Sequence, residues 1–206
     1  DIKNLEDFIP RTESVLILCS KRISDTKILD DIRNRVNKKV FICDKILPNP
    51  DLNHLDHLHK EYLNKDLGLI ICIGGGSIID TGKALSISLL KDKNFTFSGF
   101  FREQFDTTWE KKIPCLVIPT TSGTGSEFTP FATIWDKERN KKYSMDNYLV
   151  FPDYVLLDPS LTLTLNFENT LYGALDALSH SLESIWNKNA SKVSRTFSMN
   201  ALKLIR

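Results

Sequence analysis

Three short segments of this chain combine residue types at spacings that could do chemistry, and the first is residues 74–80. Its sequence, GGGSIID, places three consecutive glycines directly before Ser77. Glycines let a backbone approach a pyrophosphate closely, and the N–H groups and dipole at a helix start attract its negative charge. The ordinary GxGxxG dinucleotide fingerprint is absent, and a tight strand–helix turn without a ligand is the alternative. Because three glycines exceed what a turn requires, we favour a phosphate site.

The second segment, residues 119–127, reads PTTSGTGSE and interleaves hydroxyl side chains with glycines. It follows an apolar run, residues 115–118, which has the composition of a strand. In open α/β sheets, ligands bind in the crevice beyond the carboxyl ends of the strands. The segment is therefore a candidate ligand loop, with a Ser/Thr-rich connector as the alternative.

The third segment contains Asp176 and His180, which are four residues apart. On a helix such residues share one face, so a carboxylate and an imidazole can converge on one cation. The neighbouring Leu175, Leu178 and Leu182 predict a largely buried helix. A buried carboxylate needs a partner, and a metal ion is a suitable one. A surface Asp–His pair without a metal is the alternative interpretation.

Apolar runs without polar alternation must position the first two segments. They are residues 15–19, 40–43, 69–73 and 115–118. Such runs are typical of strands that are covered on both faces of a parallel sheet. Stretches with helical periodicity alternate with them, at residues 23–36, 52–63 and 78–90. This alternation predicts an α/β fold, a Rossmann-like doubly wound parallel sheet with right-handed crossovers.

The pattern of predicted secondary structure changes along the second half of the sequence. A hairpin is expected over residues 129–143 with a polar turn at 136–140, and a further strand at 154–157. Beyond residue 161 the sequence shows only helical periodicity. We therefore expect an α/β domain over residues 1–165 and the beginning of a helical domain over residues 166–206.

The composition is that of an ordinary soluble globular protein, 206 residues long with 41% hydrophobic and 26% charged residues. The formal net charge of +1 does not favour nucleic acid or an anionic membrane as a partner. We recognise neither a signal peptide nor an apolar run near the roughly 20 residues that span a bilayer. The chain begins at Asp1 and ends at Arg206 without a helix-ending signal, so we expect both ends to be trimmed.

The cysteines and most of the histidines receive structural interpretations. Each of the four cysteines lies in or next to an apolar run, and buried reduced thiols fit a cytoplasmic protein. His54 and His57 can share one face of the predicted helix, whereas His59 is turned away from it. We expect a solvated amphipathic helix there rather than a metal site.

The three chemical segments, in the order GGGSIID, PTTSGTGSE and DALSH, resemble the iron-containing (group III) alcohol dehydrogenase family. The resemblance covers residues 15–206. It implies a nucleotide-binding domain over residues 1–165, followed by an all-helical metal-binding domain that begins over residues 166–206. It also implies hydride transfer between NAD or NADP and an aldehyde or primary alcohol, with a divalent metal as Lewis acid. Iron is the expected metal, with zinc as the alternative.

The resemblance also implies roles for individual residues. Gly75, Gly76 and Ser77 would hold the cofactor pyrophosphate. Lys142 matches a lysine that contacts the ribose on the nicotinamide side. The remaining cofactor-binding residues would be Asn49, Asp80, Thr120, Thr121 and Thr124.

Asp176 and His180 match two of the four metal ligands of the family. The other two are histidines farther along, and this sequence has no histidine after His180. Because two protein ligands rarely hold a catalytic metal, a nucleotide-binding fragment without a complete catalytic site is an alternative function. A dehydroquinate-synthase-like lyase, which combines the same two domains, is another. The hydroxyl-rich loop and the DALSH helix favour the dehydrogenase.

One departure from the family pattern concerns the cofactor. Ser20 stands where many relatives place an aspartate that binds the adenosine ribose hydroxyls and excludes a 2′-phosphate. Serine cannot repel a phosphate, and Lys21 and Arg22 are adjacent cations, so use of NADPH is a hypothesis beside use of NAD.

The expected substrate is a small aldehyde or alcohol, and the expected assembly is a homodimer. Segments 131–136, 141–144 and 183–187 resemble relatives that reduce phosphonoacetaldehyde.

Overall fold

The computed structural model describes residues 2–9, 14–104 and 107–205. Contacts between residues divide the chain into two compact units. The sheet unit comprises Asp1–Pro119 and Ser126–Asp158, and the helical unit comprises Thr120–Gly125 and Pro159–Arg206. Residues 120–125, here called the hydroxyl-rich loop, were expected in the α/β domain but group with the helices that follow residue 158.

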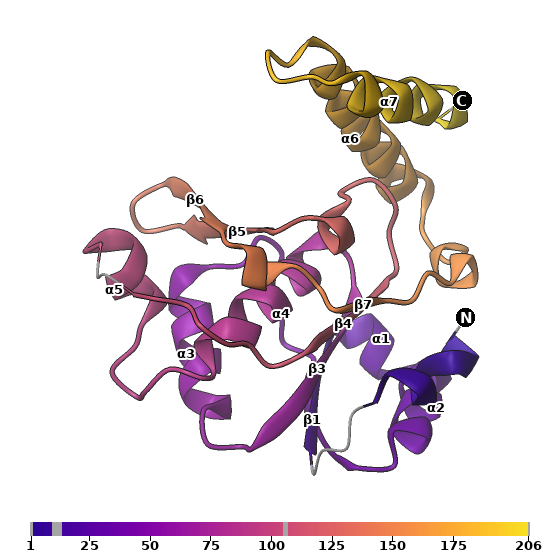
Figure 1. Cartoon of the computed structure of the whole chain (residues 1–206). Coiled ribbons are helices and arrows are strands. Elements are labelled where there is room, and N and C mark those ends of the chain that lie inside the picture. The colour runs from indigo at the N-terminus through magenta and orange to yellow at the C-terminus, as the bar shows by residue number, and fades with distance from the viewer. Residues whose placement is uncertain (1, 10–13, 105–106, 206) are drawn as a thin grey trace. The chain divides into compact units, whose positions relative to one another are not determined.

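The sheet unit is built on a five-stranded parallel sheet with strand order β2-β1-β3-β4-β7 (Figure 1). The strands are β1 (Ser14–Cys19), β2 (Lys39–Cys43), β3 (Leu67–Gly74), β4 (Cys115–Pro119) and β7 (Tyr154–Val155). Strands β2 and β3 lie on opposite sides of β1, so the chain reverses its direction across the sheet there. In open α/β sheets, this switch point is where ligands bind. The predicted α/β class with a Rossmann-like parallel sheet is confirmed.

Helices cover both faces of the sheet, with α1 and α2 on one face and α3 and α4 on the other (Figure 1). The helices of this unit are α1 (Lys21–Ser24), α2 (Lys27–Val36), α3 (Leu52–Tyr62), α4 (Gly76–Ser88) and α5 (Phe97–Arg102). Every residue of β1 and β4 is buried, as their unbroken apolar sequences predict. Helix α4 is the central helix, since it is buried from Thr81 to Ser88.

A two-stranded antiparallel hairpin, β5 (Phe131–Asp136) and β6 (Lys141–Asp146), packs on α4. The hairpin is confirmed, although its second strand continues past the predicted end at residue 143. Alternate residues of β5 are buried, namely Ala132, Ile134 and Asp136. Short 3₁₀ helices connect the larger elements, and they are η1 (Ile2–Phe8), η2 (Ser126–Phe128), η3 (Tyr148–Val150) and η4 (Pro159–Thr162).

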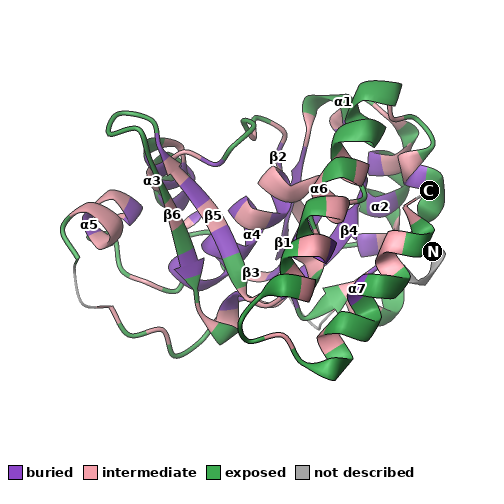
Figure 2. Cartoon of the chain, turned by 90° about the horizontal axis from the view of Figure 1, so that it is seen from above, coloured by how far each residue is buried: buried purple, intermediate pink, exposed green. Residues whose placement is uncertain are grey.

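The helical unit contains α6 (Phe167–Trp186) and α7 (Lys192–Leu204), which pack against each other. Asn166 caps the first helix, and Ser191 forms a capping box with Ser194 at the start of the second. Figure 2 shows how much of both helices is exposed. The expectation of a largely buried metal-ligand helix is wrong for this structure, because Ser181 is the only buried residue described in α6.

The cysteines lie in the core of the sheet unit. All four are buried and free, as their apolar surroundings predict. Cys72 and Cys115 face each other across β3 and β4 with their sulfur atoms 3.9 Å apart. Among the described helices, none combines the length and the apolar character needed to cross a membrane.

Candidate functional site

The glycine-rich turn follows the central strand β3 and starts helix α4, at the switch point of the sheet. Gly75 is the N-cap of this helix and, as a glycine, has no side chain to cap the first turn. The leading N–H groups of a helix that lacks such a cap are the groups that can bind an anion. A Cβ atom on Gly82 would lie 2.0 Å from the sulfur of Cys72, so a glycine there lets α4 pack closely on β3. The start of α4 at Gly75, Gly76 and Ser77 is therefore a place where an anion such as a pyrophosphate could bind.

The loop that contains Asn49 braces this turn. The backbone N–H of Asn49 donates a hydrogen bond to Ser77 Oγ at 3.0 Å. Asn49 adopts a left-handed conformation with φ of 58°, which asparagine tolerates better than most residues. The structure thus brings together two predicted site residues that are 28 positions apart in the sequence.

Asp80 has its carboxylate fully engaged within the sheet unit. Its Oδ1 accepts from Ser126 Oγ at 2.5 Å, and its Oδ2 accepts from the Thr133 N–H at 2.9 Å. Burial raises the pKa of Asp80, while the Ser126 hydrogen bond and the charge of Lys83 oppose that rise. The geometry therefore makes Asp80 an anchor for η2 and β5, whereas its predicted contact with a cofactor remains a prediction.

Lys83 is the partner of Asp80 that the sequence reasoning missed. Its Nζ lies 3.6 Å from Asp80 Oδ1, and the whole side chain is buried. Nζ donates to the carbonyl oxygen of Ser126 at 2.9 Å and to Thr129 Oγ1 at 3.2 Å. Burial lowers the pKa of Lys83, and the negative charge of Asp80 opposes that effect. The available signal was the spacing of three residues, which places both side chains on one helical face.

The hydroxyl-rich loop packs backbone to backbone on helix α6 within the helical unit. Gly123 has φ of 131°, and a Cβ atom there would lie 2.2 Å from the Gly173 carbonyl oxygen. A Cβ atom on Gly173 would lie 2.1 Å from the Ser122 carbonyl oxygen. Both glycines are therefore required for the close approach. The loop carries the predicted residues Thr120, Thr121 and Thr124.

Lys142 lies on the hairpin, directly opposite Trp135. Its Nζ sits 5.6 Å from the centre of the Trp135 ring, in a cation–π contact. The N–H of Trp135 donates to the Pro50 carbonyl oxygen at 2.7 Å, which joins the hairpin to the segment next to Asn49. Lys142 is therefore carried by a hairpin that is anchored next to the loop that braces Ser77.

A largely buried ion pair fixes the turn of this hairpin. Arg102 donates to both carboxylate oxygens of Asp136, at 2.7 and 2.6 Å, and also contacts Glu138 at 2.8 Å. The Arg102 guanidinium holds the pKa of Asp136 below its usual range. Such bidentate pairs restrict orientation as well as distance, so the turn of the hairpin has one defined position.

Asp176 and His180 share one face of α6, as their spacing predicts. Asp176 Oδ1 and His180 Nε2 are 3.7 Å apart, and the two side chains are about half exposed. One carboxylate and one imidazole at this separation fit a divalent cation such as iron or zinc. Catalytic metals usually take three or more protein ligands, and the described residues contain no group of three candidate ligands. The pair is therefore at most part of a metal site.

Helix α3 is amphipathic, as we expected, and its histidines differ in exposure. His57 is exposed and lies 3.6 Å from Glu61, but His59 is completely buried. Its Nδ1 has no hydrogen-bond partner among the described residues, and its ring packs edge-on against Phe95. His59 is buried because the segment after α4 folds over this side of α3, which the periodicity of α3 alone could not reveal.

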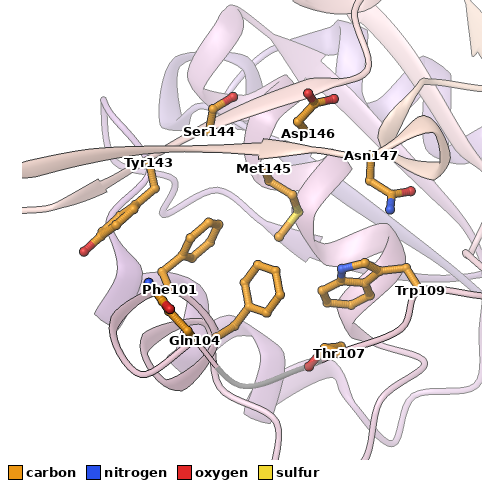
Figure 3. Close-up of a pocket in the computed structure, with 10 residues that line it drawn as sticks. Phe101, Gln104, Thr107, Trp109, Tyr143, Ser144, Met145, Asp146 and Asn147 are labelled. Atoms are coloured by element: carbon orange, nitrogen blue, oxygen red, sulfur yellow. The ribbon is translucent and has the colours of Figure 1, made fainter.

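A cavity of about 630 Å³ lies between α5 and β6, apart from the predicted site residues. Figure 3 shows Tyr143, Met145 and Asn147 pointing into it, whereas Ser144 and Asp146 point to the other side of the strand. Phe100, Phe101 and Trp109 complete its wall. None of the predicted cofactor or metal residues lines this cavity.

Comparisons with known proteins agree on one family. The sequence profile described as iron-containing alcohol dehydrogenase matches residues 1–159. The chain is 30% identical over 188 residues to an aldehyde-alcohol dehydrogenase of Streptococcus pneumoniae. That alignment covers 87% of this chain and 21% of the relative. The chain is also 28% identical over 193 residues to a 1-propanol dehydrogenase of Salmonella typhimurium. This second alignment covers 93% of this chain and 48% of the relative. The chain thus spans between about a fifth and about half of the length of these relatives.

The solved structures agree with the sequence relatives. An iron-containing alcohol dehydrogenase from Thermotoga maritima has a similar fold, with a TM-score of 0.84 and 29% identity. The similarity covers 98% of this chain and 55% of that one. The likeness in fold therefore extends over nearly all of the present chain.

Proposed function

This chain belongs to the iron-containing alcohol dehydrogenase family, and we propose that it binds a nicotinamide dinucleotide for hydride transfer to or from a small aldehyde or primary alcohol. The observation that carries the proposal is the glycine turn at the switch point of the sheet. There the uncapped start of α4 and the Asn49–Ser77 hydrogen bond form a cradle suited to a pyrophosphate. Because the chain spans at most about half of the relatives' length, the activity of the whole protein is part of the proposal.

We propose the roles of the cofactor-binding residues from the family resemblance. Gly75, Gly76 and Ser77 would bind the pyrophosphate through backbone N–H groups and the serine hydroxyl. Lys142 would contact the ribose on the nicotinamide side. The hydroxyl groups of Thr120, Thr121 and Thr124 would line the cofactor cleft. The family resemblance supports these assignments, and the cofactor itself supplies the hydride chemistry.

Asp176 and His180 would contribute two ligands to the metal of the family. A bound divalent metal, iron or alternatively zinc, would polarise the substrate carbonyl as a Lewis acid. The half-exposed pair on α6 leaves room for the further ligands that such a site needs. The helical segment from residue 166 would then be the start of a metal-binding domain, and residues 1–165 the nucleotide-binding domain.

The resemblance to phosphonoacetaldehyde reductases supports a small aldehyde as the substrate. We also propose, from the resemblance alone, a homodimer that works in the cytoplasm.

A binding experiment tests the central claim. The fluorescence of NADH and NADPH is titrated with the purified chain, and Ser77→Ala is compared with Ser179→Ala on the exposed face of α6. We expect binding that weakens about tenfold in Ser77→Ala only, because one hydrogen bond to a charged group is lost. Absence of binding to both dinucleotides would refute the proposal.

An activity measurement then separates the alternatives. Oxidation of the reduced cofactor that depends on both a short aldehyde and added Fe²⁺ supports the dehydrogenase. Cofactor binding without such oxidation identifies a nucleotide-binding fragment. A product that forms without net oxidation of the cofactor identifies a lyase.

A further inference from the structure

The ends of β1 and β2 form one polar corner of the sheet unit. Ser20 follows β1 directly, and Asp44 follows β2 directly. The two turns touch, since Ser20 and Lys45 form an antiparallel backbone bridge. The carboxylate of Asp44 is therefore next to the position at which we noted a serine in place of an aspartate.

The contacts of Asp44 fix its side chain in this corner. Its Oδ2 accepts from Ser24 Oγ at 3.0 Å and from Lys21 Nζ at 3.2 Å. These two contacts lower the pKa of Asp44, so its carboxylate is charged at neutral pH. The described side chains that donate to Asp44 all do so at Oδ2, and a carboxylate has capacity to accept further hydrogen bonds.

Lys21 is engaged by two carboxylates. Besides contacting Asp44, its Nζ lies 3.4 Å from Oδ1 of Asp25, the C-cap residue of α1. The side chains of Lys21, Asp25 and Asp44 together carry one net negative charge. Lys21 is thus already neutralised, and among these three side chains an excess carboxylate remains.

The same corner is connected to the glycine turn. Residues 44–49 run from the end of β2 to Ser77, where the Asn49 N–H donates to the serine hydroxyl. Only β1 separates β2 from β3 in the sheet, so the ends of these strands are roughly 10 Å apart by the usual strand spacing. A ribose attached to a pyrophosphate at the start of α4 can reach across this gap to Asp44.

We propose that Asp44 makes the site select NAD over NADP, because its carboxylate accepts hydrogen bonds from the adenosine ribose hydroxyls and repels a 2′-phosphate. The inference rests on the proposed function, since it assumes that the glycine turn binds a dinucleotide. It reverses the expectation drawn from Ser20, Lys21 and Arg22. An acidic side chain that binds ribose hydroxyls is a general device in dinucleotide-binding sheets, and here it would come from the second strand.

The test is direct measurement of binding by calorimetry with the whole chain, using NAD⁺ and NADP⁺ in parallel. We expect wild-type protein to bind NAD⁺ at least about tenfold more tightly, because one dinucleotide gains charge-assisted hydrogen bonds and the other meets a like charge. Asp44→Asn should reduce that ratio about tenfold. The matched control is Asp25→Asn, which removes the same charge from the other side of Lys21 but no acceptor proposed for the ribose, and it should reduce the ratio less than Asp44→Asn does.

Each outcome has a distinct meaning. Wild-type protein that binds NADP⁺ as tightly as NAD⁺ overturns the role of Asp44 and leaves the proposed cofactor site standing. Arg22→Ala and Lys45→Ala then identify the cation that binds the phosphate. Protein that binds neither dinucleotide refutes the proposed function and this inference with it. The wild-type comparison needs no substitution, so the inference remains testable even if Asp44→Asn does not fold.

Discussion

The ammonium nitrogen of Lys83 lies 3.6 Å from the Asp80 carboxylate in the core of the sheet unit, and no part of the lysine reaches solvent. Both residues belong to α4, and both contact Ser126 at the start of η2. Asp80 also accepts from the backbone of β5. The ion pair therefore ties the helix that follows the glycine turn to the segment that follows the hydroxyl-rich loop and to the hairpin that carries Lys142.

Replacing one member of this pair should destabilise the sheet unit strongly. Lys83→Met leaves the Asp80 carboxylate buried beside an apolar group, which should lower the free energy of unfolding by about 3 kcal/mol. Urea denaturation followed by circular dichroism measures the change. The double variant Asp80→Asn with Lys83→Met should lose less than the sum of the single variants, because the two residues interact. Additive losses would show that the pair is not coupled.

The approach of the hydroxyl-rich loop to α6 should depend on specific glycines. Gly123→Ala places a methyl group against the Gly173 carbonyl, so the loop must move away from the helix. Gly125→Ala is the matched control, because its Cβ would meet nothing within 4 Å and only the φ of 63° opposes it. We expect the control to cost roughly 1–2 kcal/mol and Gly123→Ala to cost more. Thermal unfolding and limited proteolysis of the loop measure both, and equal effects would contradict the close approach.

Buried His59 should make stability depend on pH. Burial lowers the pKa of His59 below its ordinary value of 6.5, so the folded state resists protonation. The unfolded chain takes up the proton first as the pH falls below 6.5. The stability present above that pH is therefore lost as the pH falls towards the lower folded pKa, at up to about 1.4 kcal/mol per pH unit.

The variant His59→Phe isolates this effect. Denaturation between pH 7 and 5 should show a shallower loss of stability in the variant, since phenylalanine keeps the packing on Phe95 and cannot be protonated. This pH range lies above the pKa values of Asp44 and Asp136, which are lowered from 3.8, so these two carboxylates stay charged throughout the measurement. An unchanged slope would show that His59 is not the group responsible. His54, whose pKa burial also lowers, is then the next candidate.

Metal binding by α6 can be compared with a matched pair on α3. Asp176 and His180 are 3.7 Å apart, and Glu61 and His57 form a similar exposed pair at 3.6 Å. If the first pair belongs to a metal site, His180→Ala should weaken Zn²⁺ or Fe²⁺ binding at least about tenfold, as loss of even an outer partner does. His57→Ala should change nothing. Calorimetric titration measures both, and equal effects would mean that the α6 pair is an ordinary surface pair.

The sequence by itself determined the elements and their order. Short unbroken apolar runs are typical of strands that are covered on both faces, and the glycine turn between β3 and α4 is encoded by consecutive residues. Likewise, Asp176 and His180 meet because helical geometry alone places residues four apart on one face. Predictions of this kind depend only on interactions between neighbours in the chain.

Only the tertiary structure decided which distant side chains meet. The sequence did not indicate that Lys83 is buried against Ser126. It also did not indicate that the turn with Asp44, after β2, lies beside the turn with Ser20, after β1. Nor did it indicate that His59 is buried, or that the hydroxyl-rich loop contacts α6 through paired glycines. These contacts join residues from separate elements, and their formation depends on how strands and helices pack. Local spacing carries no information about that packing, and the balance of charges at the polar corner depends on it.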